Sequence, residues 1–239
     1  MRIEIWSDVV CPWCYIGKRR LERALAEFPH ADQVEVVYRS FELDPSAPRH
    51  EHGGERELTT PVLARKYGQD EVQMRRMQEQ LVATAAEEGL AFRLLENVHT
   101  NTVDAHRLLH LALETGGPTL QRELKETMLA AYFSRAEDVG DPAVLRRLAT
   151  GAGLDAARVD AVLAGDEFAD AVEADIAQAR AYGAGGVPFH VVDGRYGVSG
   201  AQPTEVLAQV LERAWTDAHP VLETLAGAAD ACGPDGCAI

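Results

Sequence analysis

The sequence lacks the long apolar run that a membrane span requires. Such a span needs about 18 or more consecutive apolar residues, and no stretch of the 239 residues comes close to this. It also lacks the clusters of lysine and arginine with which nucleic acid binding proteins displace counterions. The net charge of −15 works equally against an anionic membrane surface. We therefore expect neither a nucleic acid nor a membrane as partner.

Cysteine is scarce, with four in the whole chain, too few for the disulfide framework of a small secreted protein. The hydrophobic share of 46% and the charged share of 26% are those of a globular protein rather than a disordered chain. The first residues, MRIEIWSD, contain neither the apolar segment nor the cleavage site of a signal peptide. We expect a cytoplasmic protein, in which cysteine pairs indicate redox or metal chemistry.

The first part of the chain predicts a βαβ unit. Residues 2–7 alternate as in a strand, an amphipathic helix follows over about 12–28, and residues 34–42 form a second β-rich run. The next block, over about 59–183, is almost entirely helical, with capping and breaking residues that divide it into several helices. In one of these helices Met74 and Met77 share a face, which we interpret as core packing.

The last part of the chain returns to β structure. Two β-rich runs flank Asp193-Gly194, a dipeptide typical of a tight hairpin, and a helix follows over about 203–217. The order is thus βαβ, a helical block and ββα, so the block is an insertion whose helices cover one side of an α/β core. The predicted units are a core of residues 1–58 and 184–218, an inserted helical domain of residues 59–183, and a C-terminal arm of residues 219–239.

The strongest chemical signal is the segment Cys11-Pro12-Trp13-Cys14. A C-x-x-C that follows a strand and opens a helix is typical of a thiol–disulfide redox site. The helix N-terminus carries a partial positive charge that stabilises a thiolate. Cys11 is therefore the expected nucleophile, and Cys14, one turn further on, the resolving thiol. Half of a zinc site is the alternative, but zinc needs about four ligands and no second pair lies nearby.

Two other features carry weaker signals. Val187-Pro188 opens the first β-rich run after the helical block, where a proline fits the start of a strand. Composition alone leaves open whether its peptide bond is cis or trans. His106 and His110 lie four residues apart on a predicted helix, a spacing that can bind metal, but no carboxylate joins them in register. We favour a structural role for this pair and predict no metal site.

The segment from Ser7 to Gly17, SDVVCPWCYIG, resembles the active-site segment of the DsbA-like thioredoxin family, in particular of its FrnE-type branch. Residues 186–189, 197–202 and 101–108 resemble other parts of that branch, so the resemblance spans essentially the whole chain. It implies an α/β, thioredoxin-like fold with a large all-helical insertion between the βαβ and ββα halves. It also implies thiol–disulfide oxidoreductase activity.

The resemblance further implies roles for particular residues. Pro188 is implied to be cis, to face Cys11 and to act in catalysis, and the backbone of Val187 to hold the substrate. The other residues expected to line the substrate groove are Pro12, Trp13, Asn101 and His106. Periplasmic members usually carry histidine between their cysteines, and Trp13 cannot stabilise a thiolate by charge. This difference favours a disulfide reductase or isomerase over a strong oxidant.

Two alternatives stay open at this point. The related kappa-class glutathione transferases and hydroxychromene carboxylate isomerases resemble the helical block, but they typically have serine in place of Cys11 and use glutathione. The other alternative is a metal-binding or redox-sensor protein that uses all four cysteines. We favour an oxidoreductase that acts on protein or small-molecule disulfides, as a monomer or homodimer. We expect no bound cofactor, and glutathione or a thioredoxin-type protein as the reductant.

The second cysteine pair, Cys232 and Cys237, encloses the sequence Gly-Pro-Asp-Gly. These residues favour a tight turn, which can bring two cysteines to the separation that a disulfide requires. Some FrnE-type proteins resemble this chain in carrying a C-x4-C pair near their end. We predict a secondary redox pair that exchanges electrons with Cys11 and Cys14; the alternative is a pair of idle thiols.

Overall fold

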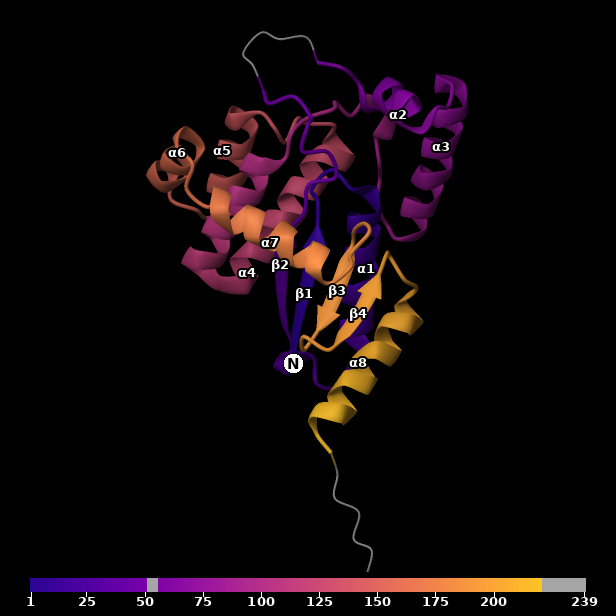
Figure 1. Cartoon of the computed structure of the whole chain (residues 1–239), viewed down its shortest axis with the longest axis vertical. Coiled ribbons are helices and arrows are strands. Elements are labelled where there is room, and N and C mark those ends of the chain that lie inside the picture. The colour runs from indigo at the N-terminus through magenta and orange to yellow at the C-terminus, as the bar shows by residue number, and fades with distance from the viewer. Residues whose placement is uncertain (51–55, 221–239) are drawn as a thin grey trace, which may run out of the picture.

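The computed structural model describes residues 1–50 and 56–220, and Figure 1 shows how their elements are arranged. Within these residues four strands form one sheet in the order β2-β1-β3-β4. β1 and β2 run parallel, whereas β3 is antiparallel to both β1 and β4. The strands are β1 (Arg2–Ser7), β2 (Glu35–Ser40), β3 (Phe189–Val192) and β4 (Tyr196–Ser199).

The two halves of the sheet come from the two ends of the described chain. Helix α1 (Pro12–Glu27) connects β1 to β2, and α8 (Thr204–Ala218) follows the hairpin of β3 and β4. At the hairpin turn, Asp193 and Gly194 have positive φ angles of 49° and 65°, the backbone that a tight two-residue turn requires. The predicted order of βαβ, helices and ββα is therefore confirmed.

Helices fill the chain between β2 and β3. Their bounds are α2 (Thr59–Tyr67), α3 (Glu71–Glu87), α4 (Val103–Arg135), α5 (Pro142–Gly151), α6 (Ala156–Ala164) and α7 (Ala169–Ala181). Asp70, Asp141 and Asp155 cap α3, α5 and α6 by accepting a backbone N–H from the first turn. The sequence predicts two helices in the region of α4. This is confirmed, because α4 consists of two helical parts that meet at a kink at Gly117, whose φ of 67° and ψ of −167° are not helical.

Helices cover both faces of the sheet. Ile5 of β1 packs with Leu21 of α1 and Leu211 of α8. The neighbouring Trp6 packs on the opposite face against Ala179 of α7, because successive side chains of a strand point to opposite faces. The inserted helices thus cover the face opposite α1 and α8, as expected (Figure 1).

The outer edge of β2 is closed by side chains of the inserted helices. Gln121 of α4 forms two hydrogen bonds with the backbone of Tyr38, each 2.9 Å long. Asp175 of α7 accepts the backbone N–H of Ser40 at 2.8 Å. An open strand edge invites pairing with another chain, so these contacts protect the sheet and fix the insertion on it.

Helix α1 belongs to two apolar cores at once. Its first turn contributes Tyr15 and Ile16 to the large core of the inserted helices, where they join residues such as Leu108 and Phe133. Further along, Leu21 contributes to the core between α1, α8 and the sheet. Since close-packed cores tolerate little displacement, the N-terminus of α1 is held firmly between the sheet and the insertion.

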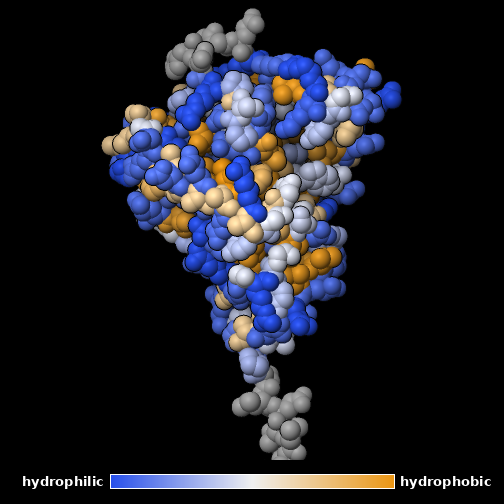
Figure 2. Space-filling view, viewed as in Figure 1, coloured by the Kyte–Doolittle hydropathy of each residue, from blue (hydrophilic) through white to orange (hydrophobic). Residues whose placement is uncertain are grey.

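Hydrophilic residues dominate the face of the molecule shown in Figure 2, and apolar residues form separate patches between them. No helix in the described part of the chain has the length and hydropathy of a membrane span. Among the described residues, the large apolar side chains that remain exposed are Trp13, Leu43, Leu58, Tyr67, Val72, Met77, Tyr182 and Val206. Half of them, namely Trp13, Leu43, Tyr67 and Met77, surround a single cavity.

Candidate active site

The turn between β1 and α1 carries the C-P-W-C segment. Cys11 immediately precedes α1, and Pro12 is the first residue of the helix, where a missing backbone N–H costs no hydrogen bond. The N–H of Cys11 donates to the carbonyl of Asp8 at 3.4 Å, and that of Cys14 to the carbonyl of Cys11 at 3.0 Å. These bonds hold Cys11 at the positive end of the helix, where a thiolate is stabilised.

The two thiols differ in access, although both are unbridged and only 4% exposed. Cys11 lines the cavity together with Pro12 and Trp13, whereas Cys14 is not part of the lining. Burial raises the pKa of Cys14 well above its usual value, and the neighbouring Cys11 adds to this effect. Cys11 is therefore the thiol that a molecule in the cavity can reach.

The Val187-Pro188 segment lies against Cys11. Its peptide bond is cis, and the Cys11 thiol donates a hydrogen bond to the carbonyl of Val187, with Sγ and O 3.5 Å apart. Pro188 also packs on α1, because a Cβ added to Gly17 would lie 3.0 Å from Pro188 Cγ. The cis bond and its place beside Cys11, both implied by the resemblance, are thus confirmed.

Replacing Gly17 by alanine tests this packing. The added Cβ would crowd Pro188 Cγ, so we expect the Pro188 segment to move away from Cys11. The reduction of a small disulfide, followed by stopped flow, should slow several-fold. The free energy of unfolding should change by less than about 1 kcal/mol. Alanine is a better helix former than glycine by about that amount, and the crowding of Pro188 opposes this gain. The control is Gly185→Ala, where a Cβ meets nothing within 4 Å. An unchanged rate for Gly17→Ala would show that the contact is dispensable.

A buried polar cluster supports the turn. Asp8 and His106 are each 1% exposed, and His106 Nε2 lies 3.3 Å from Asp8 Oδ1. The other carboxylate oxygen of Asp8 accepts the N–H of Leu43 at 2.8 Å. Burial opposes the charge on Asp8, but His106 and the Leu43 amide hold the pKa of Asp8 below its usual value. Burial lowers the pKa of His106, so near neutral pH it is a neutral hydrogen-bond donor to an ionised Asp8.

Lys125 of α4 reaches the same turn from the insertion. It is fully buried, and its ammonium group donates to the carbonyl of Ser7, with Nζ and O 3.4 Å apart. Burial lowers the pKa of Lys125 to about 8, against the attraction of Cys14 and Asp8. While burial raises the pKa of Cys14, the charge of Lys125 acts in the opposite direction. Lys125 is thus a cation that favours the thiolate form of the buried thiol.

The sequence itself contains a signal for Lys125, although it belongs to no motif. Lys125 stands in helical register with Gln121, Met128 and Tyr132 of α4, and all of these side chains are buried. Lysine is rarely buried without a partner. A lysine in such a register is therefore a candidate for a functional site.

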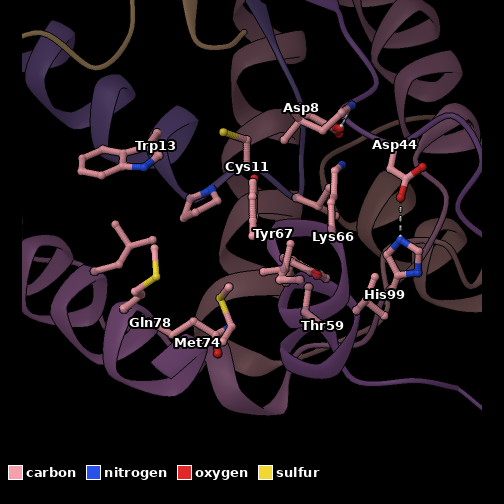
Figure 3. Close-up of a pocket in the computed structure, with 18 of the residues that line it drawn as sticks. Asp8, Cys11, Trp13, Asp44, Thr59, Lys66, Tyr67, Met74, Gln78 and His99 are labelled. Atoms are coloured by element: carbon pink, nitrogen blue, oxygen red, sulfur yellow. Dashed lines mark hydrogen bonds and ion pairs between the residues drawn. The ribbon is translucent and has the colours of Figure 1, made fainter. Parts of the chain in front are cut away.

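The cavity beside Cys11 has a volume of about 660 Å³. One wall consists of the Cys11-Pro12-Trp13 segment with Gly186 and Val187, and the opposite wall is formed by α2 and α3 (Figure 3). At one end, a hydrogen bond joins Asp44 and His99, with 3.1 Å between Oδ2 and Nε2. The inserted helices α2 and α3 therefore complete a pocket whose thiol comes from the other wall.

Asn101 and His106 do not line this cavity, which corrects the expectation that they form part of a substrate groove. The amide of Asn101 is buried and donates to the carbonyl of Ala47 at 3.3 Å, while its Oδ1 accepts the N–H of Val103 at the start of α4. His106 faces Asp8. Both side chains form hydrogen bonds with buried polar groups next to the site, and these bonds direct them away from the cavity.

The histidine pair on α4 makes structural contacts. His110 Nε2 lies 3.1 Å from Ser40 Oγ and 3.1 Å from an oxygen of Asp175, whereas His106 contacts Asp8. In residues 1–50 and 56–220, no three histidine, cysteine or carboxylate side chains converge as a group that could hold a metal ion.

Cys232 and Cys237 lie outside these residues, so their predicted role as a secondary redox pair stays a prediction.

A model of the DSBA-like thioredoxin domain family matches residues 2–212. This chain belongs to that family. The match covers both halves of the sheet and the whole insertion, and it confirms the predicted thioredoxin-like fold with a helical insertion. The chain is thus a member of a DsbA-like family of thiol–disulfide oxidoreductases.

The family contains a solved structure of high similarity over the full length. The chain is 48% identical to a probable DsbA oxidoreductase from Streptomyces coelicolor, with a TM-score of 0.84, and the match covers 100% of this chain and 99% of the other. A curated relative is YwbO from Bacillus subtilis (strain 168), an uncharacterized protein, which is 28% identical over 167 residues. That match covers 68% of this chain and 72% of YwbO.

More distant structures share the fold. The cytosolic disulfide reductase DsbM from Pseudomonas aeruginosa, solved with GSH, is 16% identical with a TM-score of 0.61, and the match covers 89% of this chain and 98% of DsbM. A 2-hydroxychromene-2-carboxylate isomerase is 13% identical with a TM-score of 0.66, over 91% of this chain and 98% of the isomerase. A disulfide reductase and an isomerase thus share this architecture, so the fold alone does not distinguish the two activities and the side chains of the site must.

Proposed function

We propose that the protein is a thiol–disulfide oxidoreductase of the reductase or isomerase type, of the FrnE-type branch, which acts in the cytoplasm on protein or small-molecule disulfides through its C-P-W-C segment. The observation that carries this proposal is the placement of Cys11. Its thiol stands at the N-terminus of α1, in the wall of a cavity and against the carbonyl of Val187. Cys14 is one helical turn away and out of contact with the cavity.

Catalysis starts with an attack of the Cys11 thiolate on one sulfur of a substrate disulfide. A disulfide forms between Cys11 and that sulfur, the substrate S–S bond breaks, and the other substrate sulfur leaves as a thiolate that takes up a proton. Cys14, after losing its proton, then attacks the sulfur of Cys11. The Cys11–Cys14 disulfide forms and the second substrate thiol is released, so the substrate gains two electrons and the enzyme loses two.

An external thiol closes the cycle. Glutathione or a thioredoxin-type dithiol returns two electrons to the Cys11–Cys14 disulfide and is itself oxidised to a disulfide. No bound cofactor enters this scheme, because each step is an exchange between thiolates and disulfides. The related isomerases typically have serine in place of Cys11, so the presence of both cysteines favours disulfide chemistry over glutathione-dependent isomerisation.

An insulin-reduction assay tests the proposed function. With dithiothreitol as electron donor, the protein should accelerate the precipitation of the insulin B chain. The reduction potential of the Cys11–Cys14 pair against glutathione then gives the direction of the reaction. A value near that of thioredoxin, about −270 mV, indicates a reductase, and a much higher value indicates an isomerase or oxidase. A protein that leaves insulin intact and transforms a glutathione-dependent substrate would be of the isomerase or transferase class instead.

The predicted secondary pair allows a separate test. If Cys232 and Cys237 exchange electrons with the active site, the double variant Cys232→Ser/Cys237→Ser should reduce insulin more slowly. Its Cys11–Cys14 redox equilibrium with glutathione should also differ from that of the parent. If the rate and the equilibrium both equal those of the parent, the pair takes no part in the mechanism.

A further inference from the structure

His190 is a buried histidine that the proposed disulfide chemistry does not use. It lies on β3, two residues after Pro188, and is only 2% exposed. It is paired with Ile5 of β1 on one side and with Val198 of β4 on the other (Figure 1). Because β3 is an inner strand with neighbours on both sides, the imidazole stands in the middle of the sheet rather than at its edge.

The face of the sheet that carries the imidazole is apolar. Directly paired residues of antiparallel strands place their side chains on the same face, so His190 shares the face of Ile5. Ile5 packs there with Leu21 of α1 and Leu211 of α8, and Val192, the next residue of β3 on this side, belongs to the same core. His190 is therefore enclosed between the sheet and the helices α1 and α8.

The imidazole has little that compensates for its burial. In the described residues its Nδ1 is one of two buried side-chain nitrogen or oxygen atoms without a hydrogen-bond partner, the other being Ser7 Oγ. A polar atom without a partner is costly in an apolar core, and a charge there costs still more. Burial lowers the pKa of His190 to about 4, while the backbone of Val198 acts in the opposite direction. The ring is therefore neutral near pH 7.

A proton on this ring would meet no counter-charge. The titratable side chains on the surrounding elements are Arg2 and Glu4 of β1, Cys14, Tyr15, Lys18, Arg19, Arg20, Glu22, Arg23 and Glu27 of α1, Tyr196 of β4, and Glu205, Glu212, Arg213 and Asp217 of α8. The cations of α1 pair with Glu22, Glu88 or Glu126. Among the groups that the structure describes, only burial and the Val198 backbone shift the pKa of His190. The positive charge would thus stay uncompensated in the core.

Strand β3 connects His190 to the active site. Val187 and Pro188 immediately precede the strand, and the carbonyl of Val187 accepts the hydrogen bond of the Cys11 thiol, with Sγ and O 3.5 Å apart. The carbonyl of Pro188 accepts the N–H of Gly200, just after β4, at 2.8 Å. A displacement of β3 therefore displaces the segment that lies against Cys11.

We propose that His190 makes the active site acid-sensitive. Protonation of the buried imidazole separates β3 from α1 and α8, and the Val187-Pro188 segment then moves away from Cys11. The enzyme loses its hold on the substrate, and a return to neutral pH restores it. This inference rests on the proposed disulfide chemistry and adds a regulation of the same site.

The expected size of the effect follows from the proton affinities of the two states. In the opened strand the imidazole has the ordinary pKa of 6.5, and in the closed strand a pKa of about 4. Between these values the open state binds more protons than the closed one, so acid favours opening. From pH 7 to pH 5 the ratio of open to closed molecules should rise about twentyfold, and above pH 7 it should stay constant.

Backbone amide hydrogen exchange tests the opening directly. It is followed by mass spectrometry at pH 5 and pH 7 and corrected for the intrinsic exchange rates. In the parent, a peptide that covers β3 and β4 should open about twentyfold more often at pH 5, whereas a peptide from α5 should change by less than twofold. An equal increase in both peptides would show general acid unfolding and overturn the inference.

Variants assign the response to His190. His190→Leu fills a similar volume and His190→Gln keeps a polar group, but neither side chain titrates, so both variants should lose the increase at pH 5. His219→Gln is the control, because His219 is an exposed histidine at the end of α8, and it should respond as the parent does. An increase that persists in the His190 variants would show that another group senses the acid.

Reduction of bis(2-hydroxyethyl) disulfide gives the effect on activity. Acid slows every variant because the attacking thiolate takes up a proton, so each rate is compared with that of the parent at the same pH. The ratio of His190→Leu to parent should be near one at pH 7 and at least threefold higher at pH 4.5. A ratio that stays constant would show that the opening does not reach the substrate, and the inference would be wrong.

The two measurements also separate the regulation from the function. If the parent leaves bis(2-hydroxyethyl) disulfide intact at pH 7, the proposed function fails, while the exchange data still decide whether β3 opens in acid. If the parent reduces it but β3 opens equally often at pH 5 and pH 7, the function stands and the acid-sensitive role of His190 is wrong.

Discussion

Replacement of Cys11 by serine should reduce disulfide turnover to the uncatalysed background. Cys11 is the cysteine that lines the cavity and contacts Val187, so its loss removes the only thiol that a bound disulfide can reach in the described residues. Cys14 cannot take over, because burial raises its pKa well above its usual value and keeps it protonated. Turnover is measured as insulin reduction and as consumption of bis(2-hydroxyethyl) disulfide.

The complementary variant Cys14→Ser should stop the reaction one step later. Cys11 can still attack the substrate, but no thiol follows to resolve the mixed disulfide, which should therefore accumulate. Intact-protein mass spectrometry should show one substrate molecule per enzyme, attached to the peptide that contains Cys11. The double variant Cys11→Ser/Cys14→Ser is the control and should form no adduct. Adducts at Cys14 in an active Cys11→Ser protein would reverse the two roles.

The parts of the site that lie close together in the sequence could be predicted, because local rules decide them. The C-P-W-C segment combines a strand end, a proline at the first helical position and two cysteines one turn apart, and each of these has a known local geometry. The hairpin at Asp193-Gly194 is equally local. The placement of Pro188 beside Cys11 could be expected only through the resemblance, since 176 residues separate Cys11 from Val187.

The residues that escaped prediction depend on tertiary packing. Met77 shares a helical face with Met74, which predicts core packing, yet Met74 is 3% exposed and Met77 50%. Both side chains line the cavity, so the face that they share meets a hollow beside α3 rather than a continuous core. Asn101 and His106 stand near the site in the fold but satisfy buried polar partners. Whether a side chain lines a cavity or supports it from behind is decided by the neighbouring helices.

Lys125 connects the chemistry of the site to the stability of the fold. Its burial lowers its pKa from the usual 10.5 to about 8, which means that folding disfavours the charged form. Below pH 8 the side chain is protonated in both the folded and the unfolded chain, and the full cost of burying the charge is present. Between about pH 8 and 10.5 the unfolded chain binds more protons, so this cost is relieved and stability rises with pH.

The substitution Lys125→Met should therefore make the protein more stable and less active. Methionine fills a similar volume without a charge, and we expect the free energy of unfolding at pH 7 to increase by about 1–3 kcal/mol. The rise in stability between about pH 8 and 10.5 should disappear. At the same time the pKa of Cys14 should rise further, because the charge that opposes its burial is gone. Release of the mixed disulfide should then slow by about threefold to fourfold for each unit of added pKa shift, because the smaller thiolate fraction is partly offset by the greater nucleophilicity of a thiolate with a higher pKa.

Two measurements on the same protein distinguish these effects. Urea unfolding at several pH values gives the stability, and rapid quenching of a single turnover gives the rate at which Cys14 resolves the mixed disulfide. In the parent this rate should rise with pH up to the pKa of Cys14, and in Lys125→Met the whole curve should lie at lower rates. Arg122→Met is the matched control, since Arg122 is an exposed cation one turn earlier on α4. If Lys125→Met is stabilised but resolves the mixed disulfide as fast as the parent, Lys125 carries no electrostatic role at Cys14.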